Sequence, residues 1–308
     1  MILVTGASGF LGKRVCRLLA ELRRDYVSTS LSLGLDLRDR NATLDYFKKI
    51  KPSYVLNCAA YVGGIQFGYK HSAELFSNNL QITLNLLEAS KRTGVNRMVN
   101  PISNCSYPGD ASLFKEDEYF NGPLHESVMV YGFVRKASWV GAWAYAKQYN
   151  LDVLNLIFSN MYGPEDHFEE ERSHALGALI MKFVEAKKNN HPEVIVWGSG
   201  KPVREWLHVD DAAEAMVRGL NVIRTDEVVN IGVGRGISII EMANLIKDYV
   251  GYKGDVRLDM TKPDGAPYKT VDGNRGKKLF DWAPGRDFNQ GIKDTIEWYL
   301  INEVENGN

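Results

Sequence analysis

"ILVTGASGFLG", residues 2–12, is the stretch that decides the fold. An apolar run typical of a strand leads into Gly6, Gly9 and Gly12, and an apolar helical pattern follows. In a dinucleotide-binding turn the first glycine permits a tight bend and the second lets backbone approach a pyrophosphate, while the third allows close helix packing. The helix N-terminus then faces the diphosphate charge. The order of strand, turn and helix makes the motif far more specific than three glycines alone.

Short apolar runs alternate with helical patterns over the first two-thirds of the chain. Strands are expected at 2–5, 26–30, 53–60, 97–103 and 151–159, and helices at 10–24, 41–50, 72–94 and from about residue 130. This alternation predicts an α/β fold, a Rossmann-type doubly wound parallel sheet with a smaller mixed α/β substrate-binding lobe. Asn41 is the expected cap of the helix at 41–50.

The two expected lobes interleave along the chain. We expect residues 1–160 to form mainly the NADP-binding Rossmann domain. Residues 161–308 are expected to form mainly the substrate lobe, with segments near 203–230 returning to the Rossmann domain.

Composition excludes several classes of function. The 308 residues carry a net charge of −1 with scattered Lys and Arg, so the sequence predicts neither a nucleic-acid partner nor a membrane surface. No apolar stretch approaches the roughly 20 residues of a membrane helix, and no basic and apolar leader precedes "MILVTG". Three scattered cysteines indicate reduced thiols, with no metal site expected, so we expect a cytoplasmic protein.

The end of the second strand bears on the choice of dinucleotide. An Asp or Glu there would select the ribose hydroxyls of NAD, but "VSTSLS" has no acid. Ser28, Thr29 and Ser30 are candidates to hydrogen-bond a 2′-phosphate. The charge is expected from Lys13, Arg14 or Arg38. The sequence therefore favours NADP(H) over NAD.

Further residues are expected to bind the cofactor. The turn contributes Ser8, Phe10 and Leu11 beside its three glycines. "LDLRD" places Asp36 and Leu37 beside the adenine, and the third strand ends at Ala59 and Ala60.

"TGASGFLG" together with "YGFVRK" (131–136) is similar to an extended short-chain dehydrogenase/reductase. Further stretches resemble the GDP-L-fucose synthase family over nearly the whole chain. They are "YVGGI" (61–65), "SNCSYP" (103–108), "NMYGP" (160–164), "RSHALGALI" (172–180), "VWGSGKPVREWLHVDD" (196–211) and "KPDGAPYK" (262–269). The resemblance implies NADPH-dependent 3,5-epimerisation and 4-keto reduction of a GDP-4-keto-6-deoxy-hexose.

The resemblance also implies residue roles. Ser103 would hydrogen-bond the oxygen on carbon 4 of the sugar, and Tyr131 would donate a proton to it as hydride arrives. Cys105 and His174 would exchange protons at carbons 3 and 5. The residues implied to bind the GDP-sugar are Asn160, Lys182, Trp197, Arg204 and Lys269.

This chemistry is coherent without the family. A ketone at carbon 4 acidifies the hydrogens on carbons 3 and 5, and an acid and a base on opposite faces of the ring can invert each centre. Thiol and imidazole suit the task because both titrate near neutral pH when perturbed. Cys16, Cys58 and His208 are interpreted as structural residues.

Arg135 occupies the position, four after Tyr131, where this class of enzymes has a catalytic lysine. A helix turns about 100° per residue, so position 135 lies about 40° from Tyr131 and position 136 about 140° away. Lys136 is therefore expected to point elsewhere, and Arg135 is the candidate catalytic cation. Arginine keeps the charge but is longer, planar and permanently protonated.

Three outcomes stay open at this point. Reduction persists, or only one activity of a related sugar-nucleotide epimerase or 4-reductase persists, or the chain is a non-catalytic nucleotide-binding regulator. The resemblance also implies a homodimer built through the helix before Gly94 and the tyrosine helix.

Overall fold

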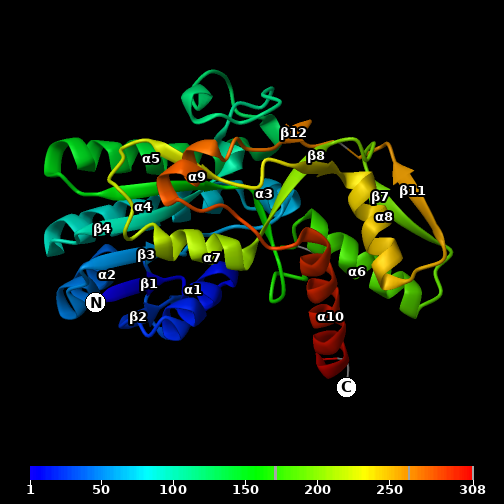
Figure 1. Cartoon of the computed structure of the whole chain (residues 1–308), viewed down its shortest axis with the longest axis horizontal. Coiled ribbons are helices and arrows are strands. Elements are labelled where there is room, and N and C mark those ends of the chain that lie inside the picture. The colour runs from blue at the N-terminus through cyan, green and yellow to red at the C-terminus, as the bar shows by residue number, and fades with distance from the viewer. Residues whose placement is uncertain (170–171, 263, 307–308) are drawn as a thin grey trace.

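A six-stranded parallel sheet forms the larger lobe, in the order β2-β1-β3-β4-β5-β9 (Figure 1). The computed structural model describes residues 1–169, 172–262 and 264–306. The strands are β1 (Ile2–Thr5), β2 (Tyr26–Thr29), β3 (Tyr54–Asn57), β4 (Arg97–Ser103), β5 (Val153–Phe158) and β9 (Val228–Ile231). The α/β prediction with a doubly wound parallel sheet is confirmed.

Helices cover both faces of this sheet (Figure 1). One face carries α1 (Phe10–Glu21) and α7 (Val209–Arg218), and the other carries α2 (Arg40–Ile50), α4 (Ser72–Thr93) and α5 (Met129–Tyr149). Successive side chains of a strand point to opposite faces. Accordingly Ile2 and Val4 pack in the core with α1 and α7, whereas Leu3 packs with α2, α4 and α5.

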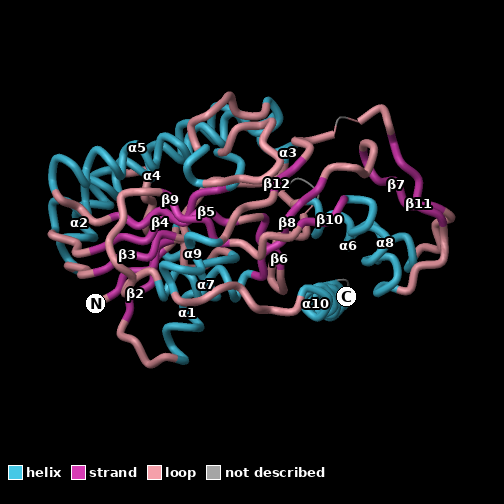
Figure 2. Tube along the Cα trace, turned by 45° about the horizontal axis from the view of Figure 1, so that its top comes forward, coloured by secondary structure: helices cyan, strands magenta, loops and turns pink. Residues whose placement is uncertain are grey.

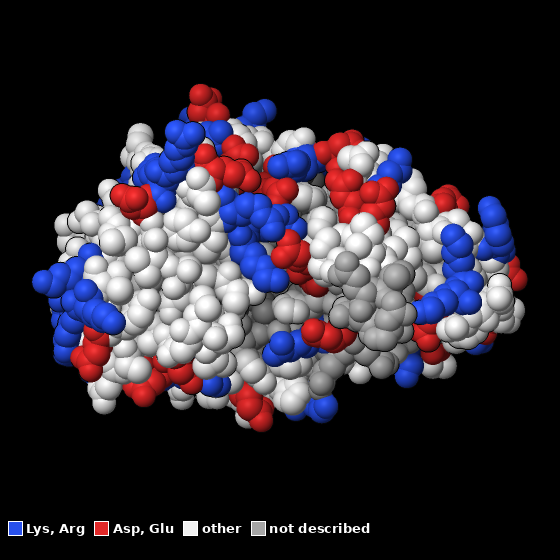
Figure 3. Space-filling view, turned by 90° about the horizontal axis from the view of Figure 1, so that it is seen from below, with Lys and Arg blue, Asp and Glu red and all other residues white. Residues whose placement is uncertain are grey.

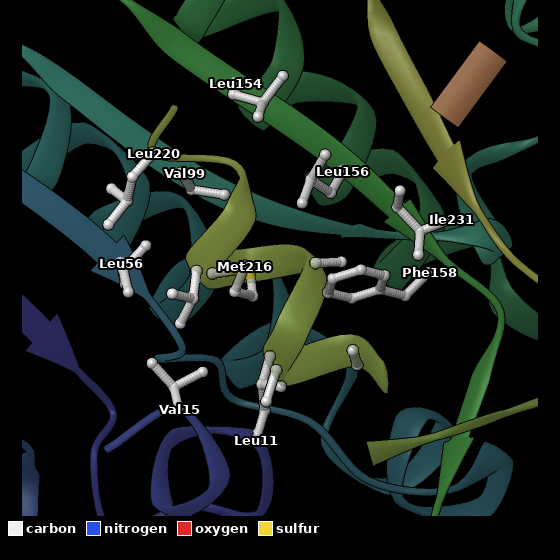
Figure 4. Packing of buried hydrophobic residues seen from close by; sticks show 14 of the residues in the cluster. Leu11, Val15, Leu56, Val99, Leu154, Leu156, Phe158, Met216, Leu220 and Ile231 are labelled. Atoms are coloured by element: carbon white, nitrogen blue, oxygen red, sulfur yellow. The ribbon is translucent and has the colours of Figure 1, made fainter. Parts of the chain in front are cut away.

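A large apolar cluster packs between the sheet and its first helical face. Figure 4 shows Leu11 and Val15 of α1 facing Met216 of α7 and side chains of the central strands, including Leu56 and Leu156. Burial of each such side chain contributes about 1.5–3 kcal/mol. This packing fixes α1, and with it the glycine turn, against the sheet.

The smaller lobe is built on short strands. A four-stranded sheet has the order β10-β8-β12 with β6 also paired to β8, and β7 pairs with β11. These strands are β6 (Asn160–Tyr162), β7 (Glu193–Trp197), β8 (Val203–His208), β10 (Gly236–Ser238), β11 (Asp255–Asp259) and β12 (Tyr268–Lys269). The helices of this lobe are α6 (Ala175–Lys188), α8 (Ile239–Val250) and α10 (Phe288–Asn306). Two short helices pack on the larger lobe instead: α3 (Ile65–Lys70) contacts α4 and α5 through Phe67, and α9 (Asn274–Phe280) places Phe280 in the main core.

The chain crosses between the lobes more than once. β8 belongs to the smaller lobe, whereas α7 packs on α1 and β9 pairs with β5 in the parallel sheet. Figure 2 shows β6, β8 and β12 lying between the parallel sheet and helices α6 and α8. The carboxyl ends of β1, β3, β4 and β5 therefore lead to the junction of the lobes, where open α/β sheets bind their ligands.

One helix start differs from the prediction. Asp39, not Asn41, is the cap of α2, because its carboxylate accepts hydrogen bonds from the Asn41 and Ala42 amides. The helix begins one residue earlier than its apolar pattern indicates.

Charges of both signs are interspersed on the face shown in Figure 3, as the scattered sequence positions predict. Among the described residues, no helix is both long and apolar enough to span a membrane.

Candidate active site

The end of β4 forms the centre of the candidate site. Ser103 is the last residue of β4, and its hydroxyl accepts a hydrogen bond of 3.2 Å from the Cys105 amide. This bond caps a single 3-10 turn, Asn104–Ser106. The turn is thereby locked in the conformation that places Ser103 and Cys105 at the carboxyl edge of the sheet.

Gly132 brings the tyrosine helix against this turn. A Cβ at position 132 would lie 2.3 Å from the Cys105 carbonyl oxygen, far inside contact distance. Only glycine therefore permits the approach, and it fixes the neighbouring Tyr131 next to the Ser103–Cys105 turn. Sequence reasoning missed this role, although a glycine in the first turn of a helix next to a candidate catalytic residue is a usable signal.

Lys269 contacts the Cys105 thiol directly. Its Nζ lies 3.2 Å from the Cys105 Sγ, and its side chain is buried at 6% exposure. Burial by itself would raise the pKa of the Cys105 thiol. The Lys269 charge and hydrogen bond, with Ser103 and Arg204, outweigh burial and lower that pKa below its ordinary value. The site therefore makes the thiolate, which is a competent base, easier to form than in an ordinary cysteine.

His174 lies immediately before α6, in extended backbone, and is partly buried. Burial, followed by the charges of His167 and Lys269, lowers the pKa of its imidazole to about 4. The ring is therefore neutral at neutral pH in the unliganded protein. Its segment is held by Gly64, whose amide donates to the Arg172 carbonyl oxygen at 3.2 Å.

Gly64 also needs to be glycine, since a Cβ there would lie 2.6 Å from the Ser173 carbonyl oxygen. The stretch 61–65 thus positions the His174 segment by close backbone contact.

Arg135 and Lys136 lie in different environments. Arg135 is buried, its guanidinium carbon lies 4.9 Å from the centre of the Tyr131 ring, and its Nη2 donates to Asn79 Oδ1 at 3.3 Å. Lys136 instead donates to the Tyr119 carbonyl oxygen at 2.6 Å and lies over the Tyr119 and Phe120 rings. The prediction that Lys136 points away from the tyrosine is confirmed. Lys136 fastens the preceding loop to α5.

A free donor remains beside the tyrosine. The Arg135 Nε is buried and has no hydrogen-bond partner among the described residues. A buried unsatisfied donor costs about 1–3 kcal/mol, so such a group fits a site completed by a ligand hydroxyl.

The glycine turn has the geometry that its sequence predicts. Gly6 has φ of +64°, and a Cβ there would lie 2.5 Å from the Ala59 amide nitrogen. A Cβ at Gly12 would lie 2.1 Å from the Gly6 carbonyl oxygen. The turn, the first turn of α1 and the end of β3 are therefore packed backbone to backbone, which fits a pyrophosphate bound by main-chain N–H groups.

The basic side chains expected near the second strand are engaged with carboxylates. Lys13 and Arg14 contact Glu165 at 3.3 and 3.2 Å, and Arg38 is paired with Asp36 at 2.7 Å. The Leu37 side chain is buried in the core, so its contact with an adenine is limited to its backbone.

The candidate GDP-sugar residues fall into three places. Arg204 is buried near Cys105, donates to the Ala266 carbonyl oxygen at 2.6 Å, and has a pKa lowered to about 10 by burial. Lys182 lies 5.0 Å from the centre of the Trp197 ring, which is 46% exposed. The Asn160 amide donates to the Glu205 carbonyl oxygen at 3.1 Å.

His208, Cys16 and Cys58, interpreted from the sequence as structural residues, cap a helix or pack against the core. His208 accepts a hydrogen bond from the Asp210 amide and caps α7. Cys16 and Cys58 pack against the main core, and burial raises the pKa of both thiols.

The parallel sheet and its glycine turn together define an enzyme of the extended dinucleotide-binding class. Residues 2–232 match the NAD dependent epimerase/dehydratase family. The chain belongs to this family and, within it, to the GDP-L-fucose synthases.

One similar relative is "Putative GDP-L-fucose synthase 2" of Arabidopsis thaliana, which is 37% identical over 305 residues, 99% of this chain and 93% of the relative. Two solved structures are also similar. A GDP-6-OMe-4-keto-L-xylo-heptose reductase from C. jejuni has a TM-score of 0.92 at 26% identity, covering 98% of this chain and 97% of that one. A GDP-L-fucose synthetase from Naegleria fowleri bound to NADP has a TM-score of 0.88 at 27% identity, with coverages of 98% and 94%.

Proposed function

We propose that this chain converts a GDP-4-keto-6-deoxy-hexose by 3,5-epimerisation and NADPH-dependent 4-keto reduction, as in GDP-L-fucose synthesis. Family membership supports the overall reaction. The observation that carries the epimerase half is the contact of Lys269 with the Cys105 thiol. A plain ketone reductase needs no acidified thiol beside its serine and tyrosine, whereas deprotonation next to a ketone requires a base.

The proton steps use Cys105 and His174. The Cys105 thiolate removes a proton from carbon 3 or carbon 5, and the negative charge moves onto the carbon-4 oxygen. Ser103 donates a hydrogen bond to that oxygen and stabilises the enolate. Negative charge on the substrate raises the pKa of the nearby imidazole, so His174 becomes an acid when substrate is bound. It returns a proton to the opposite face, which inverts the centre.

The reduction step uses Tyr131. Bound NADPH supplies the hydride that carbon 4 receives. Tyr131 donates its phenolic proton to the carbon-4 oxygen, so the ketone becomes a hydroxyl and the tyrosine becomes a phenolate. The Arg135 charge, 4.9 Å from the ring centre, stabilises that phenolate.

The residues proposed to hold NADP(H) fit the group. The turn residues Gly6 to Gly12 present main-chain N–H groups to the pyrophosphate. The free Arg135 Nε is available to a ribose hydroxyl. The backbone of Asp36 and Leu37 would lie beside the adenine, and Ala59 and Ala60, just after β3, would border the cofactor.

The GDP-sugar is proposed to bind across the smaller lobe. The exposed Trp197 ring offers a stacking face for guanine, while Lys182 and Arg204 supply positive charge for the diphosphate. Asn160 and Lys269 border the sugar. In this division residues 1–160 with α7 and β9 hold the cofactor, and the remainder of 161–308 holds the substrate. We place the reaction in the cytoplasm, where three free thiols are kept reduced.

The direct test mixes the protein with NADPH and GDP-4-keto-6-deoxy-D-mannose in deuterated water. The expected result is loss of the absorbance of the reduced cofactor, with deuterium in the product at carbons 3 and 5. Absence of NADPH oxidation with this and related GDP-4-keto-sugars would overturn the reductase assignment. Oxidation without deuterium incorporation would reduce the assignment to a 4-reductase.

Replacing Arg135 by methionine is expected to slow reduction about 10²-fold, because the phenolate left on Tyr131 loses its cation. Arg135→Lys restores the charge and is expected to stay within about tenfold of the parent. Single-turnover NADPH oxidation measures both. The matched control is Lys147→Met on the same helix, which removes a partly exposed lysine. Equal rates in the parent and Arg135→Met would contradict the role of Arg135.

A homodimer through α4 and α5 is also proposed. The two helices lie side by side (Figure 1), and both expose large apolar side chains. These are Phe76 and Leu84 on α4 and Phe133, Val140 and Trp143 on α5. A partly exposed apolar surface of this kind indicates a protein interface.

Introducing charge on this face is expected to give a monomer. Leu84 and Trp143 are 56% and 44% exposed, so Leu84→Glu with Trp143→Glu leaves the fold intact but opposes burial at an interface. Sedimentation velocity measures the mass. Ile223→Glu, at a residue 81% exposed outside these helices, is the control and keeps the dimer. A parent protein that sediments as a monomer would refute the proposal.

A further inference from the structure

Three serine hydroxyls form a closed ring at the carboxyl end of β2. Ser8 in the glycine turn donates to Ser30 at 2.9 Å, Ser32 donates to Ser8 at 2.9 Å, and Ser30 and Ser32 lie 3.1 Å apart. Ser30 directly follows β2, about 20 residues after the glycine turn. In a dinucleotide-binding domain this is where the substituent on the adenine ribose 2′-carbon is read.

The ring carries no charge, and its hydroxyls satisfy one another's hydrogen bonds. With Ser30 donating to Ser32, each hydroxyl donates one hydrogen bond and accepts one, and Ser30 also accepts the Leu33 amide. Hydroxyls rotate freely and can donate or accept. A ribose 2′-hydroxyl can therefore join the ring in either role. A 2′-phosphate can take the same hydroxyls as donors.

The nearby charged side chains do not strongly favour either dinucleotide at this ring. No carboxylate belongs to it, so a 2′-phosphate meets no direct repulsion. The basic side chains expected to attract the phosphate are held elsewhere, because Arg38 is paired with Asp36, and Lys13, Arg14 and Arg17 all contact Glu165. Discrimination between NADP and NAD is usually set by a fixed Arg or a fixed carboxylate at this position.

We propose that Ser8, Ser30 and Ser32 form an uncharged binding site for the 2′-substituent of the adenine ribose, which we call the neutral 2′-reader. It accepts both dinucleotides, so NADH acts as a hydride donor as well as NADPH. The expected turnover with NADH rests on the proposed function, whereas the expected binding of both dinucleotides does not. The expected ratio of the NAD⁺ to the NADP⁺ dissociation constant is within about tenfold, because among the described residues no unpaired Arg or Lys attracts the 2′-phosphate and no carboxylate in the ring binds the 2′-hydroxyl.

The test measures both dissociation constants by titration calorimetry, and kcat/KM for NADPH and NADH in parallel. Ser8 and Ser32 are both exposed, so charged substitutions there are tolerated. Ser8→Arg is expected to shift the binding ratio towards NADP⁺ by about ten- to a hundredfold, and Ser32→Asp is expected to shift it towards NAD⁺ by a similar factor. The Ser8→Arg effect weakens at high salt, as a charge effect does.

The matched control is Leu22→Arg, which adds the same charge at the other end of α1. That helix has 12 residues, so the added charge lies about 18 Å away, and the ratio is expected not to change. A parent preference for NADP⁺ above about a hundredfold, or variants that leave the ratio unchanged, would overturn the neutral reader.

Binding and turnover separate the two proposals. Binding of both dinucleotides without oxidation of either would support the reader while refuting the proposed function. Oxidation of NADPH with undetectable NAD⁺ binding would refute the neutral 2′-reader while supporting the proposed function. Failure of both dinucleotides to bind would overturn both.

Discussion

Replacing Cys105 by alanine should abolish proton exchange at carbons 3 and 5 of the GDP-keto-sugar, with a loss of about 10³-fold or more. The thiol is the base that the site prepares, since Lys269 lies 3.2 Å from it and lowers its pKa against the effect of burial. Alanine leaves no group that can take the proton. Deuterium incorporation from solvent, followed by mass spectrometry at a fixed time, measures the loss.

Cys58→Ala is the matched control, because burial raises the pKa of that thiol and it takes no part in the site. It is expected to keep exchange near the parent rate. Cys105→Ala is expected to keep NADPH oxidation with a substrate that already has the product configuration, because Tyr131 and Arg135 are intact. Unchanged exchange in Cys105→Ala would assign the base to another residue.

The pH dependence of exchange tests the role of Lys269 in the same experiment. In the parent the exchange rate is expected to rise with pH as the Cys105 thiol ionises, at a lower pH than for an ordinary cysteine because its pKa is lowered. Removing the cation in Lys269→Met raises that pKa, so exchange falls at neutral pH and recovers on the alkaline side. If the pH profile of Lys269→Met keeps the midpoint of the parent and shows only a lower maximal rate of exchange, Lys269 acts in substrate binding and does not set the pKa of the thiol.

Local sequence signals predicted the fold and the different directions of Arg135 and Lys136 on their helix. Gly6 and Gly12 stand where the backbone approaches too closely for any Cβ, and Gly6 also has a positive φ, which glycine adopts without strain. The choice of Arg135 over Lys136 followed from helical periodicity, and Lys136 indeed binds the Tyr119 carbonyl oxygen. The φ of Gly6 and the helix faces of Arg135 and Lys136 depend on residues within one turn or one helix.

Contacts between distant residues were not predictable in the same way. Lys269 and Cys105 are 164 positions apart, and only the assembled fold shows that the amine contacts the thiol. The pairing of Lys13 with Glu165 likewise removes a cation that the sequence assigned to the cofactor. The approach of α5 to Cys105 at Gly132 is a third case. Each joins elements that are separated in the sequence, and no short periodic signal predicts which elements meet.

Tyr131→Phe should slow reduction at carbon 4 by about 10²- to 10⁴-fold, the usual contribution of a positioned proton donor. Phenylalanine keeps the ring in its apolar cluster with Phe67 and Val134 and keeps the Arg135 guanidinium over it, so only the hydroxyl is removed. Proton exchange at carbons 3 and 5 is expected to continue, because Cys105 and His174 do not need the phenol.

The measurement pairs single-turnover NADPH oxidation with deuterium incorporation on the same sample. Tyr145→Phe is the matched control on the same helix, since that hydroxyl binds Glu88 and lies outside the site, and it is expected to leave both rates near those of the parent. Loss of both activities in Tyr131→Phe would mean that the phenol also supports the enolate. Equal reduction in parent and variant would remove Tyr131 as the proton donor. Loss of reduction with exchange kept would mean that Tyr131 and Cys105 act in separate proton transfers. Their elements meet where Gly132 of the tyrosine helix contacts the Ser103–Cys105 turn.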